Sequence, residues 1–194
     1  MADLNEPLAR TPKTPPARRR GNGAPPRKGT ALSEAKLLAF AELLFFAYRD
    51  FTRDPDAILE DFGFGRAHHR VLHFVNRHSG LSVADLLDVL TITKQSLSRV
   101  LKQLIDKGYI VQRAGRSDRR QRLLFPTEKG RVLAERLAAP QSVRLAEALK
   151  AAGPGTEAHL RRFLQAMVNA EERPKVSSIM AASPAPLKEG GEGG

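Results

Sequence analysis

Apolar residues recur at spacings of three and four along most of the central part of the chain. The first stripe, over residues 31–51, comprises Leu37, Ala41, Leu44, Phe45, Tyr48 and Phe51. A second stripe comprises Ala67, Val71, Phe74 and Val75 and is followed by a Ser-Gly stop at residues 79–80. Because this spacing places apolar side chains on one side of an α-helix, the pattern predicts two amphipathic helices.

Two helices separated by a very short connection follow. In the first, Ser82 is a candidate N-cap with Asp85 three residues later, as in a capping box, and the apolar face comprises Val83, Leu86, Leu87 and Leu90. The connection has the sequence TIT, and the next segment is TKQSLSRVLKQLIDKG, with Thr93 as candidate N-cap and Gly108 as candidate stop. Two helices joined by so short a turn predict a helix-turn-helix motif.

After this pair the pattern becomes that of two short strands. YIVQR and QRLLFP lie on either side of the arginine-rich stretch RAGRSDRRQRLL, residues 113–124, which predicts a hairpin with a basic loop. Helices are predicted again over residues 127–151, interrupted by Pro140, and over 156–173, with a Gly-Pro-Gly turn between them. The fold class is therefore mainly α, an α+β winged helix extended by N- and C-terminal helices.

Both ends of the chain lack this periodicity. Residues 1–29 are rich in proline, glycine and basic residues, and residues 174–194 have a similarly low-complexity composition, so both are predicted to be disordered. The single domain then covers residues 30–173. The basic arm is either a tail that keeps the protein soluble or a segment that binds DNA without sequence preference. Its residues do not distinguish these two roles.

Charge and composition narrow the classes of partner. The formal net charge of +11 predicts a polyanionic partner, with nucleic acid ahead of an anionic membrane surface. The absence of cysteine excludes disulfides and thiolate metal sites. No signal-peptide core and no apolar run of about 18 residues occurs, so we expect a cytoplasmic, nucleoid-associated protein without a membrane partner.

The second helix of the pair carries the candidate DNA-contacting surface. Its apolar face comprises Leu97, Val100, Leu101, Leu104 and Ile105; the opposite side comprises Gln95, Arg99, Lys102 and Asp106, with Ser96, Ser98 and Gln103 on the flanks. Glutamine suits adenine edges and arginine suits guanine edges, whereas serine, threonine and lysine can hold phosphates. An ordinary solvated face is the alternative, and Asp106 fits it better because a carboxylate repels phosphate.

Residues 90–130, LTITKQSLSRVLKQLIDKGYIVQRAGRSDRRQRLLFPTEKG, resemble the core of the MarR family of bacterial transcriptional regulators. The shared signature is an Asp-x-Arg pair in the wing, here Asp118 and Arg120, followed by a strand and a Thr-x-x-Gly helix start, here Thr127 and Gly130. Pro126 stands where a leucine is usual. Since proline lacks an N–H group and suits strand ends, we expect it only to end the wing strand.

The resemblance implies a homodimeric repressor that binds double-stranded DNA at a pseudo-palindromic operator. It implies a winged helix-turn-helix over residues 66–127 and dimerisation helices over 31–51 and 127–173. In a wing of this kind Arg120 enters the minor groove and Asp118 orients it, while Arg116, Arg119 and Arg122 contact phosphates or solvent. The predicted DNA-binding residues are Thr93, Lys94, Gln95, Ser96, Ser98, Arg99, Lys102, Arg116, Asp118, Arg119 and Arg120. The alternative to a dimer is that the apolar stripes close a monomeric core.

Four of the five histidines lie in the stretch GRAHHRVLHFVNRH. His69 and His73 are one helical turn apart, a spacing that can chelate a metal, but no nearby Cys, Asp or Glu completes a ligand set, so no metal site is predicted. With His68 they are expected to line an interface, or the cleft between the DNA-binding and dimerisation parts. There the resemblance implies a site for a small aromatic or phenolic effector. A proton-sensing role stays open.

Catalysis is disfavoured. The chain has no glycine-rich phosphate loop, no G-x-S-x-G motif and no cysteine nucleophile, so neither an enzyme nor a cofactor is predicted. Two other binding functions stay open. One is an architectural protein that binds DNA through its basic arm and wing without sequence preference or effector; the other is a winged-helix module that binds protein.

Overall fold

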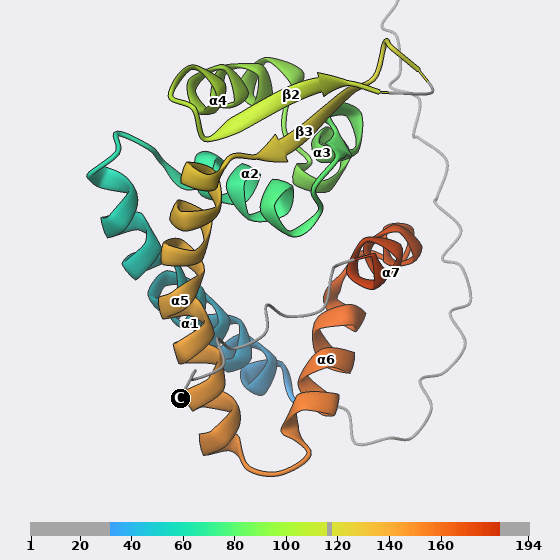
Figure 1. Cartoon of the computed structure of the whole chain (residues 1–194). Helices are drawn as coiled ribbons and strands as arrows, with labels where there is room; N and C mark the ends of the chain where they lie inside the picture. Colours follow the sequence, from blue (N-terminus) through green and yellow to red (C-terminus); the bar gives the residue numbers. More distant parts are fainter. Residues whose placement is uncertain (1–31, 116–117, 183–194) are drawn as a thin grey trace, which may run out of the picture. The chain divides into compact units, whose positions relative to one another are not determined.

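A computed structural model of the whole chain describes residues 32–115 and 118–182 (Figure 1). The chain falls into two compact units, residues 1–39 and 40–194. Of the first unit only the segment from residue 32 is described, and the fold below is that of the second. The predicted basic arm over 1–29, Arg116 and the tail beyond 182 lie outside the described residues.

The described elements are, in chain order, α1 (Glu34–Glu60), α2 (Arg66–Arg77), β1 (Leu81–Ser82), α3 (Val83–Leu90), α4 (Lys94–Asp106), β2 (Ile110–Ala114), β3 (Arg122–Pro126), α5 (Glu128–Ala152), α6 (Thr156–Met167) and α7 (Arg173–Ala181). The three strands form one antiparallel sheet in the order β1-β3-β2. Among the described residues, no helix is both long and apolar enough to cross a membrane. The predicted fold class, mainly α with a winged helix, is confirmed.

The core lies where α2, α3, α4 and α5 meet the sheet. Its fully buried side chains include Leu72 of α2, Leu86 of α3, Leu97 and Leu104 of α4, Leu124 of β3 and Leu137 of α5. Burying a leucine stabilises the fold by about 1.5 to 3 kcal/mol. This cluster therefore fixes which face of α4 points inward.

The helix starts predicted from the sequence are confirmed. Asp85 N–H donates to Ser82 Oγ at 3.1 Å, and the Asp85 carboxylate accepts from the Ser82 N–H at 3.3 Å, which is the predicted capping box. Thr93 Oγ1 caps α4 by accepting from Ser96 N–H at 3.2 Å. α4 ends at Asp106, and Gly108 has φ of +74°, a left-handed conformation that glycine adopts readily.

The first helix does not end at residue 51. It continues to Glu60 through Pro55, which has no N–H to donate to the carbonyl of Phe51. That carbonyl instead accepts a hydrogen bond from Gln141 Nε2 of α5, at 3.2 Å. A side chain 90 positions away in the sequence thus replaces the lost helical bond, which is why the sequence alone indicated too short a helix.

The interruption predicted at Pro140 is also absent. α5 runs from Glu128 to Ala152 without a break. Leu137, before the proline, is fully buried, while Gln141 and Arg144 after it bond to α1, the latter through an Arg144–Asp54 ion pair of 3.2 Å. Contacts on both sides of Pro140 therefore hold the helix axis.

The C-terminal boundaries need correction as well. α6 ends at Met167 rather than 173, and the Arg173 guanidinium bonds to the freed carbonyls of Ala166 and Val168 at 2.7 and 2.9 Å. Part of the predicted disordered tail, residues 174–181, is helical as α7, whose Lys175 forms an ion pair of 3.2 Å with Asp88 of α3. The two-residue strand β1 was not predicted, because it is recognisable only by its pairing with β3.

Candidate nucleic-acid interface

The polar side of α4 faces outward as predicted. Every predicted DNA-binding residue of this segment is exposed, namely Thr93, Lys94, Gln95, Ser96, Ser98, Arg99 and Lys102. On the opposite side Leu97, Val100, Leu101 and Leu104 are buried and Ile105 is half-buried. Because the apolar side of α4 is buried, the cationic and amide side chains on its other side face solvent.

These exposed residues differ in what else they bind. The hydroxyls of Thr93 and Ser96 bond to each other at 2.9 Å within the helix cap. Within the described part of the chain, the side chains of Lys94, Gln95 and Arg99 make neither a hydrogen bond nor an ion pair. The N-terminal half of α4 therefore offers donors that no other described group competes for.

Lys102 is held differently. Its Nζ lies 2.6 Å from Asp106 Oδ2, one helical turn later, and both side chains are exposed. An exposed pair of this type contributes little to stability, but it reduces the positive charge at the C-terminal end of the face. Positive charge on α4 is therefore concentrated at the helix start, where Asp106 is distant.

The wing is the hairpin of β2 and β3. Its register runs from Ile110 opposite Pro126 to Ala114 opposite Arg122, and α4 packs against β2, so the hairpin lies beside α4 (Figure 1). Pro126 is the last residue of β3, as the sequence predicted. Asp118, Arg119 and Arg120 are exposed in the loop that joins the strands.

The contact between Asp118 and Arg120 involves the backbone. Asp118 Oδ1 accepts a hydrogen bond from the Arg120 N–H at 2.9 Å, and Asp118 O accepts from the Gln121 N–H at 3.1 Å. Asp118 therefore fixes a turn of the loop, a common use of aspartate. No ion pair joins its carboxylate to the Arg120 guanidinium in the described residues, so orientation of Arg120 would act through the main chain.

The Thr-x-x-Gly motif connects the wing to α5. Thr127 Oγ1 accepts from the Gly130 N–H at 3.0 Å and donates to the carbonyl of Gly108 at 2.7 Å. Gly130 is buried, and its Cα lies against the carbonyl of Tyr109. One threonine thus caps α5 and ties it to the residues between α4 and the wing.

Sequence reasoning missed two features beside this surface. The Arg113 guanidinium lies 5.1 Å from the centre of the Phe125 ring, which places another exposed cation on the wing. Gln103 of α4 contacts His68 of α2, with Oε1 and Nε2 2.5 Å apart. The first could have been suspected from the arginine-rich stretch, but no local pattern joins residues 68 and 103.

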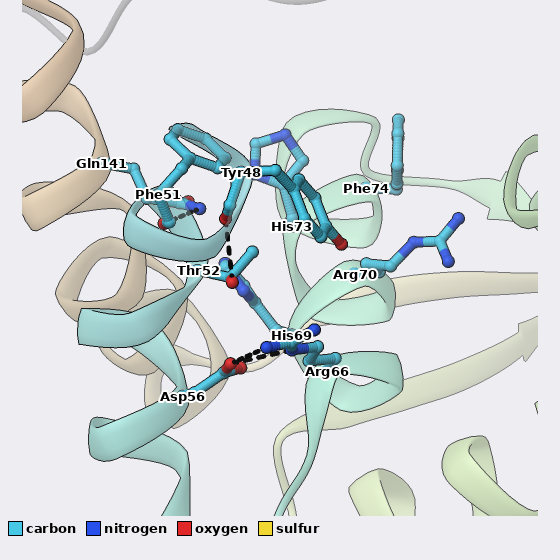
Figure 2. A pocket seen from close by; sticks show the side chains of 10 residues that line it. All are labelled: Tyr48, Phe51, Thr52, Asp56, Arg66, His69, Arg70, His73, Phe74 and Gln141. Atoms are coloured by element: carbon cyan, nitrogen blue, oxygen red, sulfur yellow. Dashed lines mark hydrogen bonds and ion pairs between the residues drawn. The ribbon is translucent and has the colours of Figure 1, made fainter. Parts of the chain in front are cut away.

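A cavity of about 290 Å³ lies between α1, α2 and α5 (Figure 2). It is lined by Tyr48, Phe51, Thr52, Asp56, Arg66, His69, Arg70, His73, Phe74 and Gln141. Arg66 and Asp56 form an ion pair of 2.7 Å that joins α2 to α1. His69 and His73 line this cavity, whereas His68, expected beside them, is not among its lining residues and contacts Gln103 of α4.

Burial favours the neutral form of both histidines of the cavity. Desolvation lowers the pKa of His73 to about 4, with smaller contributions from His69 and Arg77. Burial also lowers the pKa of His69, although nearby Asp56 partly opposes this. Within residues 32–115 and 118–182, no group of three or more metal-binding side chains lies close enough to hold an ion.

A helix-turn-helix with an exposed basic recognition helix and a basic hairpin beside it defines the winged-helix class of DNA-binding proteins. The chain belongs to the MarR family of transcriptional regulators. A model of the MarR family matches residues 62–121. The HTH-type transcriptional regulator PetP of Rhodobacter capsulatus is 51% identical over 138 residues, which cover 71% of this chain and 83% of PetP. The chain is accordingly a transcriptional regulator and not an enzyme.

Solved structures show the same fold. A MarR family regulator from Listeria monocytogenes complexed with 26mer DNA is 19% identical with a TM-score of 0.57, covering 76% of this chain and 97% of that one. A mutant MarR from E. coli complexed with operator DNA is 19% identical with a TM-score of 0.53, covering 69% and 96%. At such identities the likeness concerns the fold alone.

Proposed function

We propose that the chain acts as a homodimeric repressor that binds a pseudo-palindromic operator, with α4 in the major groove and the wing in the minor groove. The observation that carries this proposal is the row of donors on α4 that no other described residue binds, Lys94, Gln95 and Arg99, beside a wing in which Asp118 fixes a turn of the loop. Two proteins of the same fold named above are complexed with DNA, which supports DNA binding by this chain.

The apolar surface of α1 supports the homodimer. In the single chain, Phe40, Leu43, Phe45, Phe46 and Tyr48 each expose more than half of their surface, and Phe45 exposes 73%. Phe163, Leu164 and Met167 of α6 are exposed to a similar extent. Exposed apolar surface of this extent supports an interaction site, and a second copy would cover the same helices symmetrically.

The cavity between α1, α2 and α5 supports a small aromatic or phenolic effector. Tyr48, Phe51 and Phe74 supply aromatic walls, and the imidazoles of His69 and His73, whose neutral forms burial favours, can exchange hydrogen bonds with a phenol. An effector that prefers one spacing of the two recognition helices would change operator affinity by shifting that equilibrium.

The decisive experiment starts with selection of bound duplexes from a random pool by the wild-type protein. Arg99→Ala and Arg120→Ala should each weaken binding to the selected duplex by about 1 to 3 kcal/mol without changing the oligomeric state. Arg162→Ala, which removes an exposed arginine of α6, is the control for net charge. A reporter placed behind the selected duplex should be expressed less when the protein is present.

Other results would favour other functions. A steep salt dependence with equal affinity for selected and random duplexes would indicate an architectural protein instead. If both arginine variants bind the selected duplex as tightly as the wild type, α4 and the wing do not bind the operator in the proposed way.

A further inference from the structure

The start of α2 and the segment before it are attached to α4 and its C-cap residue at two points. His68, in the first turn of α2, contacts Gln103, and Lys107 Nζ donates to the carbonyl of Phe62 at 2.8 Å. Gln103 and Lys107 are four residues apart, so they lie on the same side of the helical segment. Gln103 is also four residues from Arg99, so this side lies next to the face that carries Arg99 and outside the buried stripe.

The imidazole of His68 uses both of its nitrogens. Nδ1 accepts a hydrogen bond from the backbone N–H of Gly65 at 3.1 Å, so Nδ1 carries no proton. The proton of the neutral ring is then on Nε2, which lies 2.5 Å from Gln103 Oε1 and donates to it. One side chain therefore caps the start of α2 and binds α4.

The ring plane is also fixed. Phe64, which is buried, stacks on His68 with the ring centres 4.6 Å apart and the planes at 14°. Lys107 Nζ lies 4.7 Å from the centre of the Phe64 ring. A histidine whose plane and tautomer are both set can hold the Gln103 amide in one orientation at little further cost in conformational entropy.

We propose that His68 is a positioning residue for DNA recognition: its imidazole joins the start of α2 to Gln103 and thereby fixes the rotation of α4 about its own axis. The packed apolar stripe limits this rotation from one side, and the His68–Gln103 bridge limits it from another. Gln103 is one helical turn from Arg99, about 6 Å along the axis. A small rotation at Gln103 therefore turns the side chains that face DNA.

This inference rests on the proposed function, because base reading by α4 is what the bridge would align. It assigns His68 no contact with DNA. Loss of the bridge is then expected to reduce affinity for a selected sequence, while contacts to the phosphates of a random duplex stay nearly unchanged.

Two substitutions of the same residue separate the bridge from the helix cap. In His68→Asn the short side chain can still accept from the Gly65 N–H but cannot reach Gln103. In His68→Gln the amide nitrogen can reach Gln103, and a glutamine at this third helical position can also accept from the Gly65 N–H. Both variants thus keep an acceptor for the Gly65 N–H, and they differ in the bond to Gln103.

The test measures binding of each full-length variant to a duplex that the wild type has selected and to a random duplex of the same length. His68→Asn should weaken binding to the selected duplex about fivefold, the effect of one hydrogen bond of about 1 kcal/mol. His68→Gln should stay within about twofold of the wild type. Gln103→Ala should match His68→Asn, and the double variant should show no additional loss.

Equal affinities of the Asn and Gln variants, or additive losses in the double variant, would overturn the proposal. A measurement without DNA gives a second test. Nitrogen NMR of the imidazole should show the Nε2–H tautomer of His68, and hydrogen exchange of the α4 amides should accelerate in His68→Asn but not in His68→Gln. A ring protonated on Nδ1, or identical exchange in both variants, would contradict the bridge.

Failure of the proposed function has a different signature. If the wild type prefers no sequence at all, the selection yields no duplex, which refutes sequence-specific repression, and the role of His68 in sequence reading falls with it. The NMR and exchange results would then still report whether the bridge holds α4.

Discussion

Gly130 and Tyr109 approach each other so closely that a Cβ on Gly130 would lie 2.0 Å from the Tyr109 carbonyl oxygen. Contact at that distance is impossible without movement of the backbone. The glycine of the Thr-x-x-Gly motif is therefore required by the packing of α5 against the residue that precedes the wing. The glycine of this motif is therefore explained by the close packing of α5 against Tyr109 and not by a contact with DNA.

Gly130→Ala should lower the free energy of unfolding by about 2 kcal/mol or more, because either Tyr109 or the start of α5 has to shift. Urea denaturation gives the value. Gly65→Ala is the matched control, since no atom lies within 4 Å of its Cβ position and its φ is −131°. The packing argument fails if the two variants are equally stable.

Thr91 has φ of +51° and ψ of +43°, a left-handed conformation that is strained for a β-branched residue. It lies in the turn of the helix-turn-helix, directly after α3. Thr91→Asn should raise the free energy of unfolding by about 0.5 to 1 kcal/mol, because asparagine tolerates this conformation better. Thr91→Val keeps the branched side chain and should bring no gain, so equal stability of the two variants would show that the turn stores no strain.

Asp118→Ala should weaken binding to a selected duplex about fivefold even though the wing becomes more positive, because the Arg120 N–H loses its acceptor. Asp118→Asn keeps an oxygen at that place and should retain most of the affinity. Fluorescence anisotropy titrations of both variants provide the measurement. Tighter binding by both would mean that bulk charge governs the wing.

The cavity histidines make stability depend on pH. The pKa of His73 in the folded protein is about 4, below its ordinary value of 6.5, so the unfolded chain binds more protons between these values. Stability contributed by neutral His73 is complete above pH 6.5 and should fall by about 2 to 3 kcal/mol as the pH drops toward 4.

His73→Gln should reduce this loss, and denaturation at several pH values would measure it against the wild type. His159→Gln, at an exposed histidine of α6, is the control. If the wild type and His73→Gln lose stability in parallel on acidification, His73 is not the group responsible.

Phe45→Glu should prevent dimer formation, because it places a carboxylate on the most exposed aromatic residue of α1. Sedimentation velocity would then show a monomer. The helix content of the variant should be the same as that of the wild type. Met180→Glu makes a comparable change at an exposed residue of α7, outside the predicted dimerisation helices, and should leave the dimer intact. A wild type that sediments as a monomer at all concentrations would refute the proposed homodimer.

The structural elements that could be predicted are those that depend on neighbouring residues. The cap of Ser82 and Asp85 lies within one helical turn, and the buried face of α4 follows from spacing alone, so both were predictable. The outward direction of Lys94, Gln95 and Arg99 follows from the same spacing. The wing was predictable because its charged loop lies between two short strand patterns.

The sequence by itself determined the helix-turn-helix, the wing and the residues that could face DNA, because periodicity and capping are local properties of the chain. Only the tertiary structure decided that α1 passes through Pro55, since the replacement hydrogen bond comes from Gln141. It alone also placed His68 against Gln103 and assembled the cavity around His73. These contacts join residues from distant segments, and their geometry exists only once the core has set the helices against one another.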